Sequence, residues 1–582
     1  MLRLSLLFLF ISVSIFAQDA KTYSIMIETA ISDSGFAPQV VVSWQNDSLA
    51  TKYIVSKREY EKGKFEKLVE LSGGANVFSD LDVKYNEISE YEVEKIFSYN
   101  NQLLSTKAYK ALSWEADLVE KEAKSLLILV DYTLHNTIEP KLNEYKSVLN
   151  LEGWNTIIRQ VPRVEEFNPK AALSNREIIK AIRNNTPNLT TVLILGRVAV
   201  PYSGNIAPDG HGDENGLPHK GAYPTDAFYA DMDTRDWTDT STSNIKSAFP
   251  RQHNVINDGK WDQSFIPDKA ELEVGRVDFY DLTFFSESES ELINRYLTKN
   301  IEYRTGKLLA DNDAILYDGF DARERGYAAD GWNNLTALYG RGNVKDMRVR
   351  EELPINSYEM VYANGEGALD NIYDAIYSID IAKTGYKGIH NIIFGSYNVD
   401  WDSPNNLLRS IIASEPMGLT AVWGTRPFWT YYKLGLGETF GQALVSTQNN
   451  RFEYNYPSVV YKGGVHISLM GDPTLKLINQ QPIKSIGYLT EDNQKTGLSI
   501  RLDDGEKMYG YQLILTSSEN ILEVYSTEYF DIERTGEFTI DLKKLDIQPE
   551  YLNRKVILRP IIKVYNQSGR FLYLGNGVVV NS

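Results

Sequence analysis

Four continuous apolar runs, each with the length of a buried strand, lie in the middle of the chain. They are residues 125–131, 191–196, 314–318 and 388–394. Segments with helical periodicity lie between them, at residues 138–149, 174–183 and 286–305. Apolar strands that alternate with helices are typical of a mostly parallel sheet covered by helices. The sequence therefore predicts an α/β fold for residues 113–478, with functional residues in the loops that follow the strands.

The two ends of the chain show another pattern, in which short strands are separated by turn residues. Residues 22–112 and 479–582 both have it, and it is typical of β-sandwiches. The N-terminal segment resembles a fibronectin type III module: Trp44 matches the core tryptophan, Asp80 the turn and Tyr91 the corner tyrosine. The resemblance implies a spacer or an adhesion surface. The C-terminal segment is predicted to be an immunoglobulin-like β-sandwich.

A targeting signal is predicted at the start of the chain. Arg3 precedes the mostly apolar run Leu4–Phe16, and Ala17 offers a cleavage site, so residues 1–17 are interpreted as a signal peptide. No later segment reaches about 18 uninterrupted apolar residues, so no membrane span is expected. The protein is predicted to be exported to the periplasm, the cell surface or the extracellular space.

Charge and cysteine content exclude several classes of function. The 78 acidic and 60 basic residues give a net charge of −18, which excludes a general nucleic-acid binder. The chain has no cysteine. Disulfides, thiolate metal sites and cysteine nucleophiles are therefore excluded.

The α/β region resembles the gingipain-type peptidases, a family with a caspase-like fold and a catalytic Cys–His pair. The stretches that carry the resemblance are residues 192–196, 223–231, 274–277, 388–397, 419–428 and 470–475. The resemblance implies a caspase-like, mostly parallel sheet, which we divide into subdomains at residues 113–300 and 301–478. The two terminal β-sandwiches would flank it.

The catalytic positions of that family are occupied by other residues here. Tyr397 stands where the resemblance places the histidine, and Trp423 where it places the cysteine. A tyrosine with a pKa of about 10 is a poor general base at neutral pH. An indole is not a nucleophile and would fill the cleft. Cysteine peptidase activity is therefore excluded, and a protein without catalytic activity is the favoured interpretation.

Polar residues surround these two positions and leave three interpretations open. Ser396, Asp400 and Asp402 follow one predicted strand, and Arg426 follows the next. Together with the aromatic residues they suit a polar ligand such as a peptide or a glycan. The cleft could instead be packed and degenerate. The third interpretation is a hydrolase of another chemistry that uses Asp400 and Asp402.

A structural calcium site is predicted in an acidic loop, because calcium prefers several oxygen ligands in a flexible segment. The candidate ligands are Asp226, Asp231, Asp233, Asp236 and Asp239. Gingipain-type domains often carry structural calcium, which supports this prediction, while a solvated acidic loop is the alternative. His211 and His219, beside the loop 208–215, form no zinc signature, and we expect that loop to be exposed.

These patterns together predict an exported, gingipain-like pseudopeptidase that acts as a binding, scaffold or adhesion protein. Its partner would be a protein, a peptide or a glycan. The resemblance also implies that residues 479–582 could be a sorting domain for type IX secretion. An ordinary immunoglobulin-like module is the other interpretation of that segment.

Overall fold

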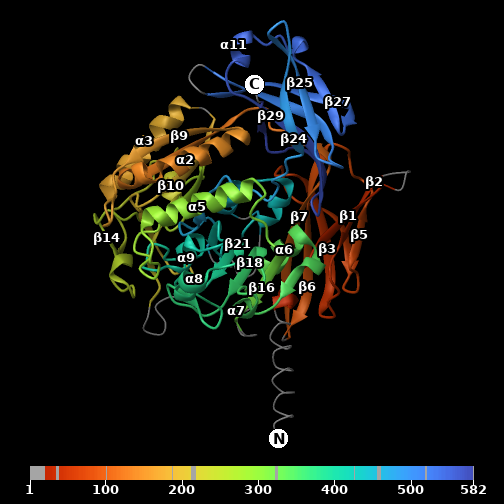
Figure 1. The fold of residues 1–582 in the computed structure, drawn as a ribbon. Coiled ribbons are helices and arrows are strands. Elements are labelled where there is room, and N and C mark those ends of the chain that lie inside the picture. Colours follow the sequence, from red (N-terminus) through yellow and green to blue (C-terminus); the bar gives the residue numbers. More distant parts are fainter. Residues whose placement is uncertain are drawn as a thin grey trace.

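The computed structural model describes residues 20–33, 38–99, 101–186, 188–211, 218–320, 326–424, 426–451, 453–454, 461–517 and 521–580. The predicted signal peptide, residues 1–17, lies outside this range. The expected mixture of helices with several sheets is confirmed, and Figure 1 shows an α/β region beside strands from both chain ends. Within the described residues, no helix is both long enough and apolar enough to cross a membrane.

A ten-stranded sheet forms the centre of the α/β region. The apolar runs of the sequence lie in β8 (Lys124–Asp131), β10 (Leu189–Leu195), β16 (Asn312–Asp318) and β21 (Gly388–Phe394). The other strands are β9 (Trp154–Val161), β15 (Glu273–Val277), β17 (Val344–Asp346), β18 (Tyr358–Asn364), β22 (Thr420–Trp423) and β23 (Leu469–Gly471). The spatial order is β17-β16-β18-β21-β22-β23-β15-β10-β8-β9. Neighbours are parallel except β22 and β23.

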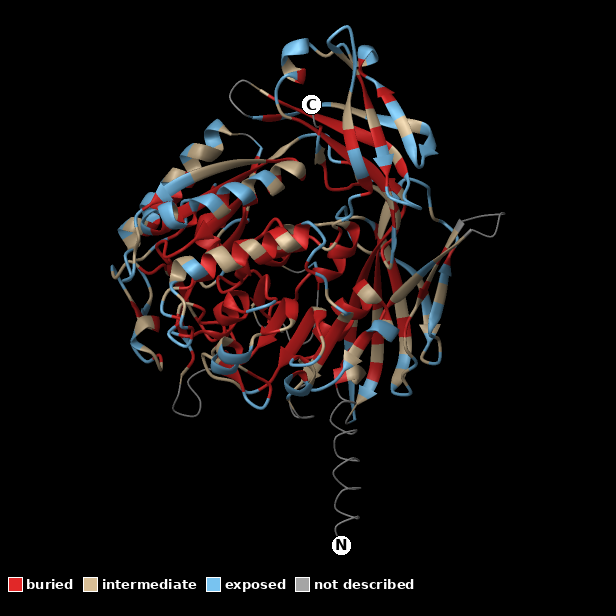
Figure 2. Ribbon diagram, viewed as in Figure 1, coloured by how far each residue is buried: buried red, intermediate tan, exposed pale blue. Residues whose placement is uncertain are grey.

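Helices follow the strands of this sheet. They are α2 (Tyr132–Leu151), α3 (Pro169–Asn185), α4 (Ala227–Ala230), α5 (Glu289–Arg304), α6 (Ala329–Tyr339), α7 (Val349–Glu352), α8 (Ser378–Thr384), α9 (Leu407–Ala413) and α10 (Phe440–Asn449). The short helix α11 (Pro549–Leu552) lies apart from this sheet, among the C-terminal strands. Asp131 caps α2 by accepting from the Thr133 amide at 2.9 Å, and a capping box of Ser288 and Glu291 begins α5. In Figure 2 the outward sides of α2 and α3 are exposed, whereas the strands beneath them are buried.

The two predicted α/β subdomains share this one sheet. Strand β23, the last of the region in sequence, lies between the strands of the first half and those of the second. The predicted boundary at residues 300 and 301 falls inside α5. At the end of β23, Asp472 accepts hydrogen bonds from Arg304 and Asn300 of α5, both at 2.8 Å. The end of the resemblance region, residues 470–475, therefore joins the sheet to α5.

The N-terminal strands form two sheets that face each other. One contains β1 (Glu28–Asp33), β2 (Pro38–Ser43) and β5 (Val77–Asp80), and the other contains β3 (Ala50–Glu59), β4 (Glu66–Ser72), β6 (Glu87–Tyr99) and β7 (Gln102–Asp117). Trp44 and Tyr53 lie in the apolar cluster between them, with ring centroids 5.0 Å apart. The Tyr91 hydroxyl donates to Asp80 at 2.8 Å. This bond closes the turn that follows β5.

The C-terminal strands continue the larger N-terminal sheet. They are β24 (Ile483–Glu491), β25 (Gln494–Leu502), β26 (Met508–Thr516), β27 (Leu522–Arg534), β28 (Glu537–Asp541), β29 (Val556–Asn566), β30 (Gly569–Leu574) and β31 (Val578–Val579). Strand β30 pairs in parallel with β7, so one sheet runs in the order β27-β26-β29-β30-β7-β6-β3-β4. In Figure 1 the blue strands at the top accordingly lie above the red strands on the right.

An apolar cluster joins all three regions of the chain. Tyr109 comes from β7, Phe571 from β30, Ala337 from α6 and Tyr432 from the turn 431–436 of the α/β region. Buried Glu90 of β6 also accepts a hydrogen bond from the Tyr432 hydroxyl at 2.9 Å. The terminal strands therefore share their core with the α/β region.

The remaining short strands are β11 (Tyr202–Ile206), β12 (Gly221–Pro224), β13 (Ser243–Asn244), β14 (Asn254–Val255), β19 (Asn371–Ile372) and β20 (Ile376–Tyr377).

We expect a chain that ends at residue 478 to lose cooperative folding. The truncation unpairs β7 and removes Phe571 from the shared cluster, leaving apolar surface and a long strand edge exposed. Size-exclusion chromatography and thermal unfolding of the truncated and complete chains measure the effect. The full-length variant Phe571→Ala should lose about 3–5 kcal/mol of stability through the cavity it leaves. A monomeric truncated chain with the melting temperature of the complete chain would show that the C-terminal strands are separable.

Candidate functional site

A buried carboxylate holds three arginines at the carboxyl end of the central sheet. Asp278 follows β15, and its carboxylate lies 3.1 Å from Arg197, which follows β10. Arg276 of β15 and Arg409 of α9 each lie 3.8 Å from it. All four side chains are buried. Burial raises the pKa of Asp278, but the three guanidinium groups outweigh it and hold the pKa below its ordinary value.

The same arginines bind two of the predicted functional carboxylates. Arg276 donates to Asp226 through Nε at 2.8 Å and through Nη2 at 2.7 Å, so the pair is bidentate. Arg197 forms an ion pair with Asp402, which also accepts from the Tyr202 hydroxyl at 2.7 Å. A predicted calcium ligand and a predicted cleft carboxylate, which the alternative hydrolase interpretation also uses, are thus the counterions of buried arginines.

Asp400 is buried in an ion pair of its own. Its Oδ2 accepts from Arg251 Nε at 2.8 Å and from Gln252 Nε2 at 3.0 Å. Burial raises the pKa of Asp400 against the lowering effect of Arg251. Its Oδ1 has no hydrogen-bond partner among the described residues. The two predicted hydrolase carboxylates therefore face different arginines on different loops.

Trp423 fills the place that the resemblance gives to the nucleophile. The side chain is buried at the end of β22, and its Nε1 donates to the Gly395 carbonyl at 2.9 Å. Its ring lies 4.9 Å from that of Phe394 and 5.5 Å edge-on from that of His466. Ser396 and Tyr397, half-buried, follow in the loop after β21. The indole is therefore held in an aromatic core between two strands.

Arg426 and Tyr397 lie against the segment that contains Asp209 and His219, for which the sequence predicted no function. Arg426 Nη1 donates to the backbone carbonyl of Asp209 at 2.6 Å. The ring of Tyr397 lies 3.9 Å from that of His219. Burial and the charge of Asp209 raise the pKa of Tyr397 to about 12. A tyrosine with this pKa does not act as a base at neutral pH.

The five predicted calcium ligands are engaged separately. Asp233 forms an ion pair with Arg183 at 2.9 Å, and Asp239 accepts from the amides of Asn257 and Gly259 at 2.8 and 2.7 Å. Asp231 accepts from the Asp268 amide at 3.3 Å, and Asp236 is exposed. With Asp226 bound to Arg276, the structure does not bring the five carboxylates together. Calcium binding by this loop stays a prediction.

Three residues whose sequence spacing shows no metal signature are brought together instead. Candidate ligand atoms of Asp209, His211 and His219 all lie within 4.8 Å of one another. The expectation of an exposed loop 208–215 is right for His211 and wrong for buried Asp209, and residues 212–215 lie outside the described residues. His219, which follows this loop, is buried. The spacing of two and then eight residues matches no standard metal motif. Only the position of the two histidines in one Gly/Pro-rich loop pointed to this cluster.

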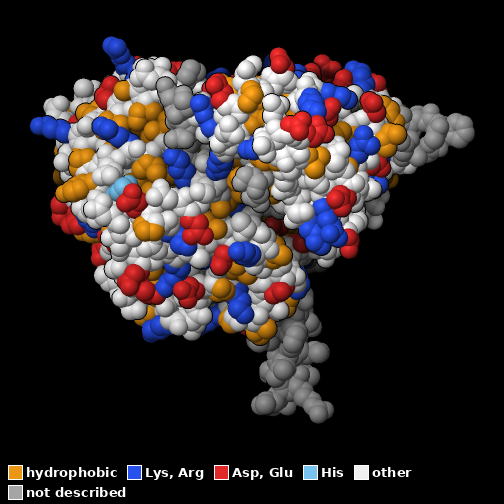
Figure 3. Space-filling view, turned by 45° about the horizontal axis from the view of Figure 1, so that its top comes forward, with side chains coloured by type: hydrophobic (Ala, Val, Ile, Leu, Met, Phe, Trp, Pro, Cys, Tyr) orange, Lys and Arg blue, Asp and Glu red, His pale blue; other side chains and the backbone are white. Residues whose placement is uncertain are grey.

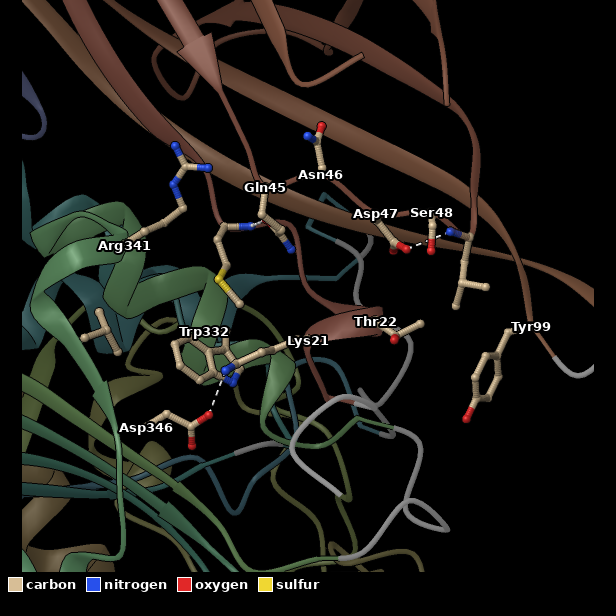
Figure 4. A pocket seen from close by; sticks show the side chains of 13 residues that line it. Lys21, Thr22, Gln45, Asn46, Asp47, Ser48, Tyr99, Trp332, Arg341 and Asp346 are labelled. Carbon is tan, nitrogen blue, oxygen red and sulfur yellow. Dashed lines mark hydrogen bonds and ion pairs between the residues drawn. The ribbon is translucent and has the colours of Figure 1, made fainter. Parts of the chain in front are cut away.

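A separate pocket of about 770 Å³ lies between the N-terminal strands and the α/β region. Figure 4 shows Lys21 pairing with Asp346 beside the ring of Trp332, with Tyr99 and Asp47 on another side. The Lys21 ammonium is 2.7 Å from Asp346 and 4.6 Å from the centre of the Trp332 ring. The lining thus combines charges of both signs with aromatic rings. None of the six predicted cleft residues lines this pocket.

Charged side chains on the molecular surface are mixed rather than segregated. On the face shown in Figure 3, acidic and basic groups are interspersed, and no broad basic area is visible there. This distribution fits the net charge of −18. A surface of this kind on that face does not offer the continuous positive potential that a nucleic-acid backbone needs.

The chain resembles solved structures but no known sequence family. No family model and no curated protein sequence matches the chain. A solved structure described as a protease covers 80% of this chain and 99% of its own, at 11% identity with a TM-score of 0.45. Pectate lyase Pel3 from Pectobacterium carotovorum covers 18% of this chain and 34% of its own, at 19% identity with a TM-score of 0.13. A β-D-glucuronidase from Dictyoglomus thermophilum covers 29% of this chain and 37% of its own, at 12% identity with a TM-score of 0.12.

Replacement of Asp278 tests whether the arginine cluster stabilises the fold. We expect Asp278→Asn to lower the free energy of unfolding by about 3–5 kcal/mol, because three buried guanidinium groups lose their shared counterion. Urea unfolding followed by tryptophan fluorescence at pH 7 measures this loss. Asp531→Asn, at an exposed position of β27, is the matched control and should leave stability unchanged.

The stabilisation by Asp278 should also depend on pH, and a comparison of wild type with Asp278→Asn measures this dependence. The pKa of Asp278 is lower in the folded protein than in the unfolded chain, so its stabilisation is present at neutral pH. It is lost as the pH falls below about 4, where the unfolded chain binds a proton that the folded protein excludes. The difference in unfolding free energy between wild type and Asp278→Asn should therefore stay constant from pH 7 to about 5 and become smaller towards pH 3. A constant difference over that range would contradict the assigned role.

Proposed function

We propose that this protein is an exported, non-catalytic relative of the gingipain-type peptidases that binds a protein, peptide or glycan partner. In this proposal the central sheet is a caspase-like fold, flanked by two β-sandwiches joined through β7 and β30. The order of strands and helices and the mostly parallel pairing of the sheet support it. Export rests on the predicted signal peptide, and type IX secretion stays a prediction.

The buried indole of Trp423 is the observation that carries the proposal. A peptidase of this kind needs an accessible nucleophile at the end of that strand, next to a base. The chain offers an indole bonded to the Gly395 carbonyl there. The residue at the histidine position, Tyr397, has its pKa raised to about 12. Neither half of the catalytic pair has a chemical substitute at its position.

The alternative, a hydrolase that uses Asp400 and Asp402, has one observation in its favour. Asp400 has a raised pKa, and its Oδ1 lacks a hydrogen-bond partner among the described residues. Such a group is a candidate general acid. Against this, buried Asp400 is the counterion of Arg251, and half-buried Asp402 is the counterion of Arg197. We therefore assign them to folding and keep hydrolysis as the outcome that would overturn the proposal.

Ligand binding is assigned to the pocket between the N-terminal strands and the α/β region. Its volume of about 770 Å³ suits a few peptide or sugar residues. Tyr99 and Trp332 contribute aromatic rings, and Lys21, Asp47 and Arg341 contribute charges. Aromatic faces with polar groups at their edges are the combination that peptides and glycans use for recognition.

Substrate profiling separates binding from hydrolysis. We expect the purified mature chain to produce no cleavage products from a panel of peptides, glycosides and esters, measured by mass spectrometry. The double variant Asp400→Asn with Asp402→Asn should match wild type in this assay. A matched control replaces the exposed pair Asp503 and Asp504 by Asn. Turnover by wild type that persists in the control and disappears in a first double variant with an unchanged melting temperature would establish the hydrolase.

Glycan and peptide arrays test the pocket. The double variant Lys21→Ala with Arg341→Gln should bind the array partners at least about tenfold more weakly than wild type, because it removes two charges from the lining. Lys62→Ala with Arg554→Gln removes the same charges from exposed sites elsewhere and should bind normally. Equal binding by the two double variants would place the ligand outside this pocket.

A further inference from the structure

We propose that Asp209, His211 and His219 bind one divalent transition-metal ion, and that Zn²⁺ is the ion they fit best. The ligand atoms would be a carboxylate oxygen of Asp209 and the Nδ1 atoms of the two histidines. This site is independent of the pocket to which ligand binding is assigned. It also differs from the acidic loop 226–239, because two of its three ligands are nitrogens.

The distances are those of a site close to its bound geometry. Asp209 Oδ2 lies 3.2 Å from His211 Nδ1 and is hydrogen-bonded to His219 Nδ1, and all three candidate atoms fall within 4.8 Å of one another. An ion would replace the hydrogen bond between Asp209 and His219. Ligands placed tetrahedrally at zinc bond lengths near 2.1 Å are about 3.4 Å apart. Small side-chain rotations are therefore enough to point the three atoms at one ion.

Neighbouring residues hold two of the ligands in place. The ring of His219 lies against Tyr397, and its backbone carbonyl accepts from the Tyr223 hydroxyl at 2.6 Å. The backbone carbonyl of Asp209 accepts from Arg426 at 2.6 Å. Such outer contacts orient metal ligands and reduce the entropy lost on binding. Tyr397 and Arg426, two of the predicted cleft residues, thus hold the cluster in place.

The backbone between the first two ligands also has a defined shape. Gly210 has φ of +82°, and a Cβ atom there would lie 2.0 Å from Arg426 Nη1. Glycine is therefore favoured by the conformation, and a larger residue would also displace the end of the Arg426 side chain. The amide of His211 donates to Asp209 Oδ1 at 3.0 Å. This tight turn places the His211 ring on the same side as the Asp209 carboxylate.

Exposure leaves one side of the cluster open to a ligand. The His211 side chain is 62% exposed, whereas that of Asp209 is 1% exposed. An ion can therefore enter from solvent and keep a water molecule or a partner's carboxylate as its fourth ligand. The buried Asp209 carboxylate supplies the negative charge. Two imidazoles with one carboxylate favour zinc, cobalt and nickel over calcium and magnesium, which prefer oxygen ligands.

Metal titration of the complete, tag-free mature chain tests the site. After chelator treatment, Co²⁺ is added and its visible absorption is recorded, and Zn²⁺ affinity is measured by competition with a chromophoric chelator. We expect one ion per chain in both measurements. His211→Asn should lower the affinity at least about tenfold, because it removes one of three ligands. His253→Asn changes a half-buried histidine outside the cluster and should bind like wild type.

A variant can lose metal binding simply because it unfolds, so the exposed ligand is replaced and the melting temperature is measured as well. His211 is exposed, so His211→Asn should fold normally, whereas His219→Asn removes a buried ring. Zn²⁺ should raise the melting temperature of wild type and of His253→Asn, and should raise that of His211→Asn less. No stoichiometric Co²⁺ or Zn²⁺ binding by wild type would overturn the proposal. Equal affinities of wild type and His211→Asn would also overturn it.

Discussion

The carboxylate of Asp278 organises the carboxyl edge of the central sheet. Parallel strands bring their ends to one edge, and here that edge places the buried guanidinium groups of Arg197, Arg276 and Arg409 close together. Buried positive charges are unfavourable unless carboxylates compensate them. Asp278 cannot compensate three arginines alone, and Asp226 and Asp402 supply the remaining negative charge. The loops after β10, β15 and β21 are thereby fixed to one another.

The need of buried arginines for counterions explains why the predicted functional carboxylates do not form a metal site or a catalytic site. Asp226, Asp400 and Asp402 have the composition of a metal or catalytic site, yet each is bound to an arginine distant in sequence. Sequence spacing cannot identify such partners, because Arg251 and Asp400 are 149 positions apart. Asp209 and His219 converge for the same reason, through a loop held by Arg426 and Tyr397. A local motif was absent in both cases.

The terminal strands illustrate a second limit of local patterns. Their alternation identified β-structure at both ends of the chain. Trp44 and Tyr91 lie in one apolar cluster, and the Tyr91 hydroxyl donates to Asp80, while the resemblance to fibronectin type III modules stays a prediction. That pattern is the same whether a strand is at an edge or paired with another segment. The parallel pairing of β7 with β30 depends on the α/β region holding the two ends side by side. The shared cluster around Tyr109 and Phe571 makes that arrangement favourable.

The sequence alone determined four strands of the central sheet, three of its helices and one chemical exclusion. Apolar runs and helical periodicity located β8, β10, β16 and β21 with the helices between them, because burial and period are local properties. The absence of cysteine excluded a thiol nucleophile in any fold. The tertiary structure decided which charges meet. It made Asp400 and Asp402 counterions and gathered Asp209, His211 and His219, because ion pairs and ligand sets form between segments that only folding brings together.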